Sequence, residues 1–230
     1  MKKYAIILLA ISLLGVGILR NKQFLYKILA SPITNFSQTI NAGTLSVDIV
    51  DDSYDSVSSP SVSMSAVTFS FACQEATGTF GTSTERIYVQ NPDAADGGWT
   101  VSLAGSSPTA VWASAGTSFD FNEAGSSGCI DDGVTTDADN YGGQMSVDPS
   151  AGILNVGQCS SCVVTNVSKG SSNAFVQGSV NTITILDAAA GSDDIGDWYL
   201  TDVDIVQKVP AEQPVASDYN INMVLSIVAK

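Results

Sequence analysis

The sequence of 230 residues predicts an all-β protein, an antiparallel two-sheet sandwich of immunoglobulin-like or jelly-roll-like kind with long acidic loops. Apolar and polar residues alternate in short runs after residue 31, and Gly, Ser, Asp and Pro separate these runs. No helical period is sustained in the same region. With 44% hydrophobic and 14% charged residues, the chain can bury a core, which excludes the class of disordered proteins.

The N-terminus has the pattern of an export segment. Lys2 and Lys3 precede an apolar run over 4–19, which is typical of a secretion signal. The run is shorter than the roughly 20 residues that cross a bilayer, and a retained anchor helix stays open as the alternative. Small Ala30 precedes a possible cleavage point. We therefore expect 1–30 to be a signal peptide or membrane anchor, and 31–230 to be one β-sandwich domain with an extended N-terminal arm.

Six runs after the arm alternate apolar and polar side chains, and each predicts a strand with one polar face. They occupy 45–49, 67–71, 99–103, 183–185, 203–205 and 219–227, and the last is the clearest. The stretches 105–139 and 187–197 are rich in Gly, Ser and Asp, and we expect them to form large loops.

Charge is divided unevenly along the chain. Five of the nine basic residues lie in the first 30 positions, and the rest of the chain carries four basic residues against all 23 acidic ones. The chain after position 30 is therefore strongly negative and repels phosphate groups, which excludes nucleic acid as a partner. Metal cations or a basic partner suit it better.

The four cysteines, Cys73, Cys129, Cys159 and Cys162, are an even number in a chain that we expect to be exported, which favours disulfides. We expect Cys129 to pair with Cys159 or Cys162. Closing a loop of about 30 residues in this way would remove about 3 to 4 kcal/mol of unfolded-state entropy. The Cys159-Ser-Ser-Cys162 spacing also permits a redox motif, although such a motif normally opens a helix.

The absence of histidine removes the commonest general base, and Ser-His-Asp and Cys-His arrangements cannot be built. A glycosidase needs only two carboxylates, but among 23 acidic residues some pair always looks suitable. We therefore expect that the protein is not an enzyme.

Two acidic loops have the residue types that bind calcium, a cation that takes carboxylate, amide and carbonyl oxygens. The first set is Asp131, Asp132, Asp137, Asp139 and Asn140, and the second is Asp187, Asp193, Asp194 and Asp197. Neither has the spacing of an EF-hand, and a solvated acidic loop is the alternative for both. Calcium is thus the predicted cofactor, and it should raise the melting temperature if it binds the folded state.

The segment NFSQTINAGTLSVDIVDD has an AGTL element at 42–45 that leads into an alternating strand with Val47 and Ile49. It resembles the N-terminal region of the TasA and camelysin family, exported proteins that assemble into biofilm fibres. The resemblance implies a sandwich fold and assembly by donation of an N-terminal strand to the next subunit. The family's suggested metalloprotease activity is not carried over, because this chain has no histidine to bind the metal.

A second resemblance rests on two separate segments. They are GTFGTSTERIYVQNPDAADGGWTVSLAG, in which Trp99 leads a strand, and the closing segment VQKVPAEQPVASDYNINMVLSIVAK. Both are similar to parts of WxL-type surface domains, which bind cell walls. The chain departs from that family at its end, where Met223-Val224-Leu225 replaces the Trp-x-Leu motif. Trp198-Tyr199-Leu200 has the motif's spacing in a different place.

The sequence therefore predicts an extracellular structural protein of the cell surface, a subunit of a filament or pilus-like fibre whose partner is further copies of itself. Ile33, Phe36 and Ile40 are apolar in the otherwise polar stretch 31–40, and we expect this arm to complete a neighbour's sheet. In the alternative arrangement, the arm folds back on its own sandwich or is a flexible linker to a retained anchor. The alternative function is that of a WxL-like wall-associated or adhesive protein, with cell-wall polysaccharide or a host surface as partner.

Overall fold

The computed structural model describes residues 37–39, 41, 43–92, 97–131, 133, 140–192 and 195–230. The expected signal or anchor at 1–30 and the arm residues Ile33, Phe36 and Ile40 lie outside these ranges. The chain divides into two units, Met1–Asn41 and Ala42–Lys230, and the second contains all of the strands described below. Over the same described ranges, no helix is both long enough and apolar enough to cross a membrane.

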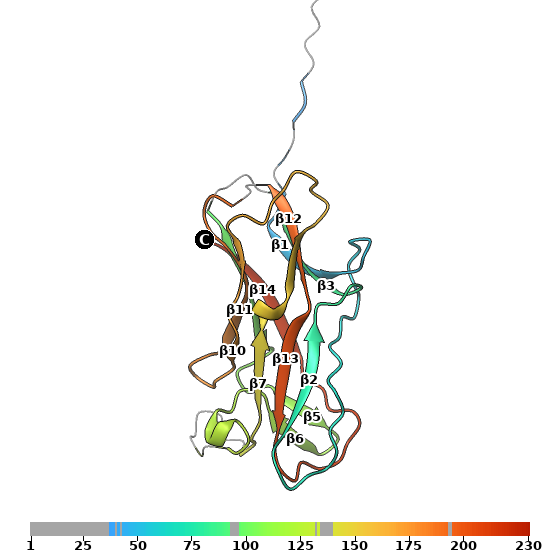
Figure 1. Cartoon of the computed structure of the whole chain (residues 1–230), viewed down its shortest axis with the longest axis vertical. Helices are drawn as coiled ribbons and strands as arrows, with labels where there is room; N and C mark the ends of the chain where they lie inside the picture. Colours follow the sequence, from blue (N-terminus) through green and yellow to red (C-terminus); the bar gives the residue numbers. More distant parts are fainter. Residues whose placement is uncertain are drawn as a thin grey trace, which may run out of the picture. The chain divides into compact units, whose positions relative to one another are not determined.

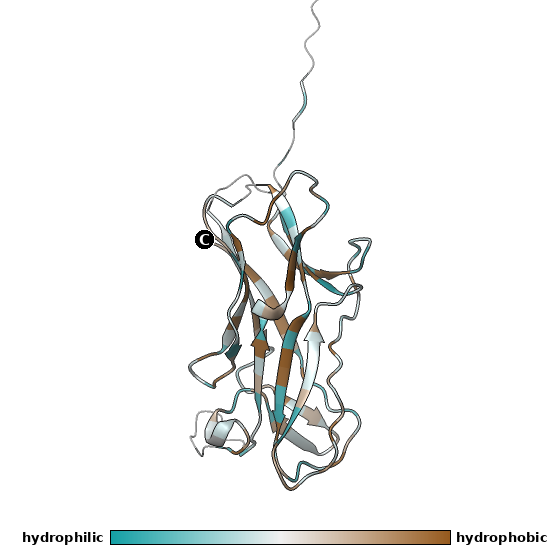
Figure 2. Cartoon of the chain, viewed as in Figure 1, coloured by the Kyte–Doolittle hydropathy of each residue, from teal (hydrophilic) through white to brown (hydrophobic). Residues whose placement is uncertain are grey.

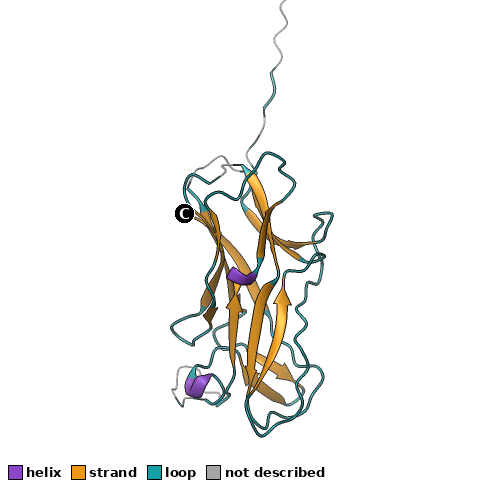
Figure 3. Ribbon diagram, viewed as in Figure 1, coloured by secondary structure: helices purple, strands orange, loops and turns teal. Residues whose placement is uncertain are grey.

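The described part of the chain is all-β, as predicted. Two single turns of 3-10 helix, η1 (Gly125–Ser127) and η2 (Pro149–Ala151), are its only helical segments (Figure 3). Every pair of neighbouring strands runs antiparallel, which is consistent with a β-sandwich.

Two four-stranded sheets share long stretches of chain. The first has the order β1 (Ser46–Val50), β3 (Arg86–Asn91), β12 (Gly196–Thr201) and β8 (Ile153–Val156). The second has the order β10 (Asn173–Ala174), β7 (Gln144–Asp148), β13 (Val203–Val209) and β2 (Gln74–Phe80).

These two sheets are the two halves of one bent layer (Figure 1). Asp202 alone separates β12 from β13, and the η2 turn lies between β7 and β8. The bend requires positive φ at two facing positions, Asp202 (60°) and Gly81 (81°). The Asp202 N–H donates to the Gly81 carbonyl at 2.6 Å, and a side chain at Gly81 would collide with the backbone of β12. The neighbouring strands therefore bend at the same place, and their pairing register changes there, from Leu200 opposite Ile87 to Val203 opposite Phe80.

The opposing layer has the order β14 (Met223–Ala229), β4 (Trp99–Gly105), β11 (Thr182–Ala188) and β9 (Val167–Lys169). The hairpin of β5 (Val111–Ser114) and β6 (Thr117–Asp120) forms a separate two-stranded sheet. Figure 2 shows hydrophobic and hydrophilic residues alternating along β13, whose apolar side chains enter the core. Trp99 and Trp198 meet between the layers with ring centroids 5.7 Å apart, and both are fully buried.

Four of the six predicted strands are confirmed, within β1, β4, β11 and β13. The predicted last strand begins later, at Met223, because the ring of Tyr219 instead packs edge-on against Phe119 at 5.1 Å. The predicted loop over 105–139 is wrong in part, since β5 and β6 lie inside it. Trp112 stacks on Phe119 across this hairpin, and Gly116 supplies the positive φ of its turn.

The strand predicted at 67–71 is wrong, because no residue from 57 to 73 belongs to a strand. Val67, Phe69 and Phe71 are exposed instead of facing a core. Alternation alone could not show that this segment lies outside the edge of the sheet, where the ladder of hydrogen bonds is not continued.

All four cysteines form disulfides, as expected, but the pairing predicted for Cys129 is wrong. Cys129 is bonded to Cys73, and Cys159 is bonded to Cys162. The physical reason is the direction of the strands. Cys73 precedes β2 at the end of the layer where β7 begins, and Cys129 lies in the connection to β7. The Cys159–Cys162 loop follows β8, at the opposite end. Two disulfides suit an oxidising compartment.

Candidate functional site

The outer edge of β14 is open. β14 pairs with β4 on one side over its whole length, from Met223 opposite Gly105 to Ala229 opposite Trp99. In the described part of the chain, no strand pairs with its other side. β1 comes near this side without pairing with it. An edge of this kind presents main-chain N–H and C=O groups that can bind a further strand.

An apolar cleft opens beside this edge. It consists of two adjoining cavities of about 490 and 450 Å³, which share Met64, Trp112 and Tyr219 in their walls. The first is lined by Met223 and Leu225 of β14 and extends to core residues of both layers. These core residues are Ile49, Leu103, Met145 and Ile205. The cleft therefore reaches from the surface to the hydrophobic core, as it would where a strand is missing from a sandwich.

The far wall of the cleft is the segment 60–72, which lies along β2 without forming a strand. Along the segment, the Ser65 N–H donates to the Thr77 carbonyl at 2.6 Å, and the Thr77 N–H donates to the Ser65 hydroxyl at 2.8 Å. Near its C-terminal end, the Glu212 N–H donates to the Ser70 carbonyl. So sparse a pattern of hydrogen bonds leaves the wall weakly attached.

Gly78 of β2 makes room for this wall. A Cβ at this position would lie 2.5 Å from the Met64 sulfur and 3.1 Å from a methyl carbon of Val62. Both side chains line the first cavity. A side chain at position 78 would therefore push the segment away from β2.

The floor between the two cavities is fixed by hydrogen bonds. The Trp112 indole donates to the Gln207 amide oxygen at 2.9 Å, and the same amide donates to the Asp120 carbonyl at 3.0 Å. The Tyr219 hydroxyl accepts from Gln213 at 2.8 Å. Sequence reasoning missed the roles of these residues, and the signal available in the stretch predicted as a loop was its three aromatic residues, Trp112, Phe119 and Phe121.

The first calcium set is only partly within the described ranges. Asp131 accepts a hydrogen bond from the nearby Gly133 N–H at 3.0 Å, and Asn140 is exposed with a positive φ. Asp132, Asp137 and Asp139 lie outside these ranges. Where side chains are described, no group of three or more His, Cys, Asp or Glu is placed to hold a metal ion. Calcium at this loop stays a prediction.

Asp187, from the second predicted calcium set, forms an ion pair and a hydrogen bond with other side chains of the protein. Its carboxylate lies 2.8 Å from the Lys230 ammonium and accepts the Thr100 hydroxyl at 2.7 Å. Burial opposes ionisation, but hydrogen bonds from Lys230 and Thr100 and the Lys230 charge outweigh it and lower the pKa of Asp187. Asp193 and Asp194 lie outside the described residues, and this calcium site also stays a prediction.

Asp197, the last member of that set, lies buried in another sheet. One of its oxygens accepts the Tyr88 hydroxyl at 2.7 Å and the Gln158 N–H at 2.6 Å, and the other accepts the Cys159 N–H at 2.8 Å. Burial of Tyr88, its hydrogen bond to Asp197 and the charge of the Asp197 carboxylate raise the pKa of Tyr88 well above its usual value. The observed role of Asp197 is to hold the loop of the Cys159–Cys162 disulfide.

The four basic residues beyond position 30 are all held by the fold. Arg86 lies over the rings of Tyr54 and Tyr199, 5.5 and 4.7 Å from their centroids. Lys169 donates to two carbonyls at the η2 turn, and Lys208 donates to the Ser127 carbonyl. Lys230 binds Asp187. The charges left to attract a partner are therefore mainly carboxylates.

Comparisons of the chain with protein-family models, with curated proteins and with solved structures found no match. The function is therefore inferred from the geometry of the cleft and its edge.

Proposed function

We propose that this protein is a subunit of an extracellular filament on the cell surface, in which an arm of one copy completes the sheet of the next. The fold that this function requires is an immunoglobulin-like or jelly-roll-like sandwich with one strand position open. The observation that carries the proposal is the unpaired edge of β14 beside an apolar cleft that reaches the core.

The arm at 31–40 has the chemistry that such a cleft binds. Side chains alternate between the two faces of an extended segment, so Phe36 and Ile40 fall on one face and Ile33 on the other. Adding a strand to an open edge supplies main-chain hydrogen bonds, while alternate side chains fill pockets. Joining copies head to tail in this way does not have to close a ring, and it can generate a filament.

Two adjacent positions of β14 give a matched test. Leu225 lines the cleft, whereas Val224 is exposed on the other face of the strand and does not line it. Leu225→Arg should place a charge where the arm binds and abolish filaments in negative-stain electron microscopy, while Val224→Arg should keep them. Circular dichroism must show that both variants are folded. Deletion of Ser31 to Gln38 should also yield folded monomers, and undiminished filaments after this deletion would rule out strand donation.

A second candidate function is that of an adhesive, wall-associated surface protein. The observation that favours it is the pair of exposed rings of Phe69 and Phe71, 5.3 Å apart, because surface proteins often bind ligands through exposed aromatic groups. Sedimentation of the protein with insoluble cell-wall polysaccharide tests this function directly.

A further inference from the structure

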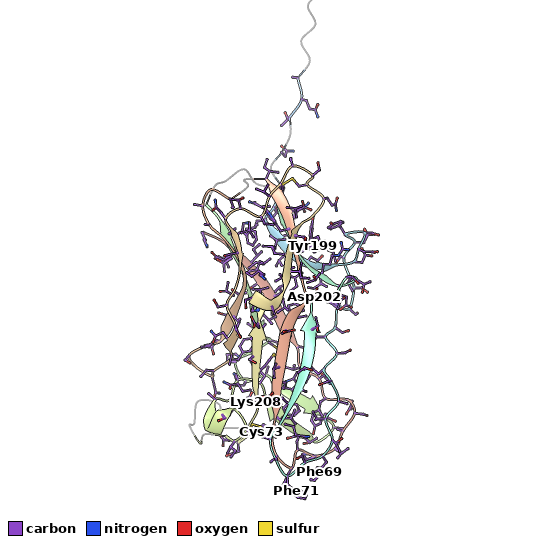
Figure 4. The ribbon with its side chains drawn as sticks, in the orientation of Figure 1. Phe69, Phe71, Cys73, Tyr199, Asp202 and Lys208 are labelled. Atoms are coloured by element: carbon purple, nitrogen blue, oxygen red, sulfur yellow. A yellow bond between two sulfur atoms is a disulfide. The ribbon has the colours of Figure 1, made fainter. Side chains whose placement is uncertain are left out.

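Two groups of exposed apolar side chains lie at opposite ends of the second unit. The aromatic patch consists of Val67, Phe69, Phe71 and Val215, and Figure 4 shows its two phenylalanines at one end of this unit. The aliphatic patch consists of Val163, Val164 and Ile195. The exposed fractions of Phe71 and Ile195 are 80% and 60%, and the protein itself therefore leaves most of both side chains in contact with water.

The strands show that the patches are far apart. Ile195 comes directly before β12, and β12 and β13 continue from Gly196 to Val209 with one residue between them. At the end of that path, Val209 pairs with Gln74, just beyond Phe71. Fourteen residues in two strands joined by the bend at Asp202 span up to about 45 Å. The patches are therefore too far apart to form one surface.

A disulfide lies next to each patch. The Cys73–Cys129 disulfide follows the two phenylalanines, whose rings contact each other edge to face. The Cys159–Cys162 disulfide precedes the two valines, and the Trp198 indole donates to the Val163 carbonyl at 2.9 Å. A disulfide limits the conformations of the adjoining backbone, so covering each patch costs less ordering than it would on an unlinked loop.

Charge indicates what covers them. The chain has a net charge of −14, and two copies therefore repel each other over most of their surfaces. The stretches 56–74 and 149–168, which include most of both patches, contain no charged residue. Five of the seven patch residues therefore lie in uncharged stretches, so packing them against each other adds little repulsion, and each copy there offers apolar area that water disfavours.

We propose that the aromatic patch of one copy packs against the aliphatic patch of the next copy, as the axial contact between consecutive subunits. This inference rests on the proposed filament. Val67, Phe69 and Val215 also line the second cavity, so the proposed contact adjoins the end of the cleft that receives the arm. Because the two patches differ and lie at opposite ends, the contact repeats in one direction and does not close. Salt should strengthen it by screening the repulsion between acidic copies.

The test measures the critical concentration for filament formation by light scattering, with the full exported chain. Phe71→Ser and Ile195→Ser each remove one patch, and Ile153→Ser is the control because Ile153 is also an exposed apolar residue but lies in neither patch and outside β14. We expect each patch variant to raise the critical concentration about tenfold, the loss that follows from leaving one large apolar side chain unburied. The control should match the wild type.

Mixing distinguishes unlike from like contacts. A mixture of Phe71→Ser and Ile195→Ser contains pairs in which an intact aromatic patch meets an intact aliphatic patch, and it should polymerise at a lower concentration than either variant alone. A mixture no better than its components would overturn the inference, as would a Phe71→Ser variant that polymerises like the control. If that variant instead loses binding to cell-wall polysaccharide, the aromatic patch is an adhesive site and the inference is also overturned.

Failure of the proposed function gives a different result. If the wild-type chain forms no filaments at any salt concentration, strand donation fails. Sedimentation velocity of wild type against Phe71→Ser then tests the patches alone. Self-association that the substitution weakens would support the axial contact, and its absence would overturn it.

Discussion

Replacing Asp197 with alanine would remove an acceptor that three donors share. The carboxylate is 5% exposed and accepts hydrogen bonds from the Tyr88 hydroxyl and from the N–H groups of Gln158 and Cys159. Tyr88 is itself buried and would keep a hydroxyl without this acceptor. The two N–H groups belong to a half-exposed loop, and water can reach them more easily.

The expected loss of stability follows from these environments. An unsatisfied buried hydroxyl costs about 2 kcal/mol, and each loop N–H that exchanges a carboxylate for water loses about 1 kcal/mol. The free energy of unfolding should therefore fall by about 4 kcal/mol. For a domain of this size, that corresponds to a decrease in melting temperature of about 10 °C. Asp197→Asn should fall in between, because its amide keeps one accepting oxygen.

Differential scanning calorimetry of Asp197→Ala measures this effect, with Asp204→Ala as the control. Asp204 is an exposed aspartate of the adjoining strand β13, so the control removes the same charge without the buried contacts. The reasoning would be refuted if the two variants melted at the same temperature.

Three further outcomes are expected. Tyr88 should stay protonated while ordinary tyrosines ionise near pH 10, and its raised pKa adds stability that is lost only as the pH rises above the ordinary tyrosine range. In an ultraviolet titration, the tyrosine that ionises at the highest pH in wild type should be missing from Tyr88→Phe. Lys230→Ala should cost under about 1 kcal/mol because its bridge to Asp187 is exposed. The pKa of Asp187 is lowered, so calorimetry at several pH values should show the difference kept above the ordinary aspartate range and lost only as the pH falls below that range and Asp187 is protonated. Gly78→Ala should displace Met64, and hydrogen exchange measured by mass spectrometry should then be faster over 61–67 than in wild type, with no change expected at β4.

The strands were predictable where alternation coincides with a paired position. Val101 and Leu103 of β4 and Val203 and Ile205 of β13 face the core as their spacing predicts. The same alternation at Val67, Phe69 and Phe71 gave a wrong prediction, because a strand needs a continuous ladder of hydrogen bonds and this segment lacks one. Whether a ladder continues depends on residues distant in sequence, and local spacing does not contain that information.

The cleft was not predictable from the sequence, although the strand β14 at its edge was. The clearest alternating run correctly indicated β14, but its unpaired side is visible only once all the sheets are assembled. The cleft walls bring together Ile49, Met64, Trp112 and Met145 from separate parts of the chain. The pairing of Cys129 was missed for the same reason, since it depends on the end of the layer at which each loop lies.

The confinement of the few basic side chains has a consequence for degradation. Beyond position 30, a protease that cleaves after lysine or arginine finds Arg86, Lys169 and Lys208 within β3, β9 and β13, where the backbone is hydrogen-bonded to neighbouring strands. Such an enzyme needs an extended, unpaired segment of substrate, and cleavage must wait for the sheet to open. At these three sites, digestion by proteases of this specificity should therefore proceed no faster than the opening of the sheet.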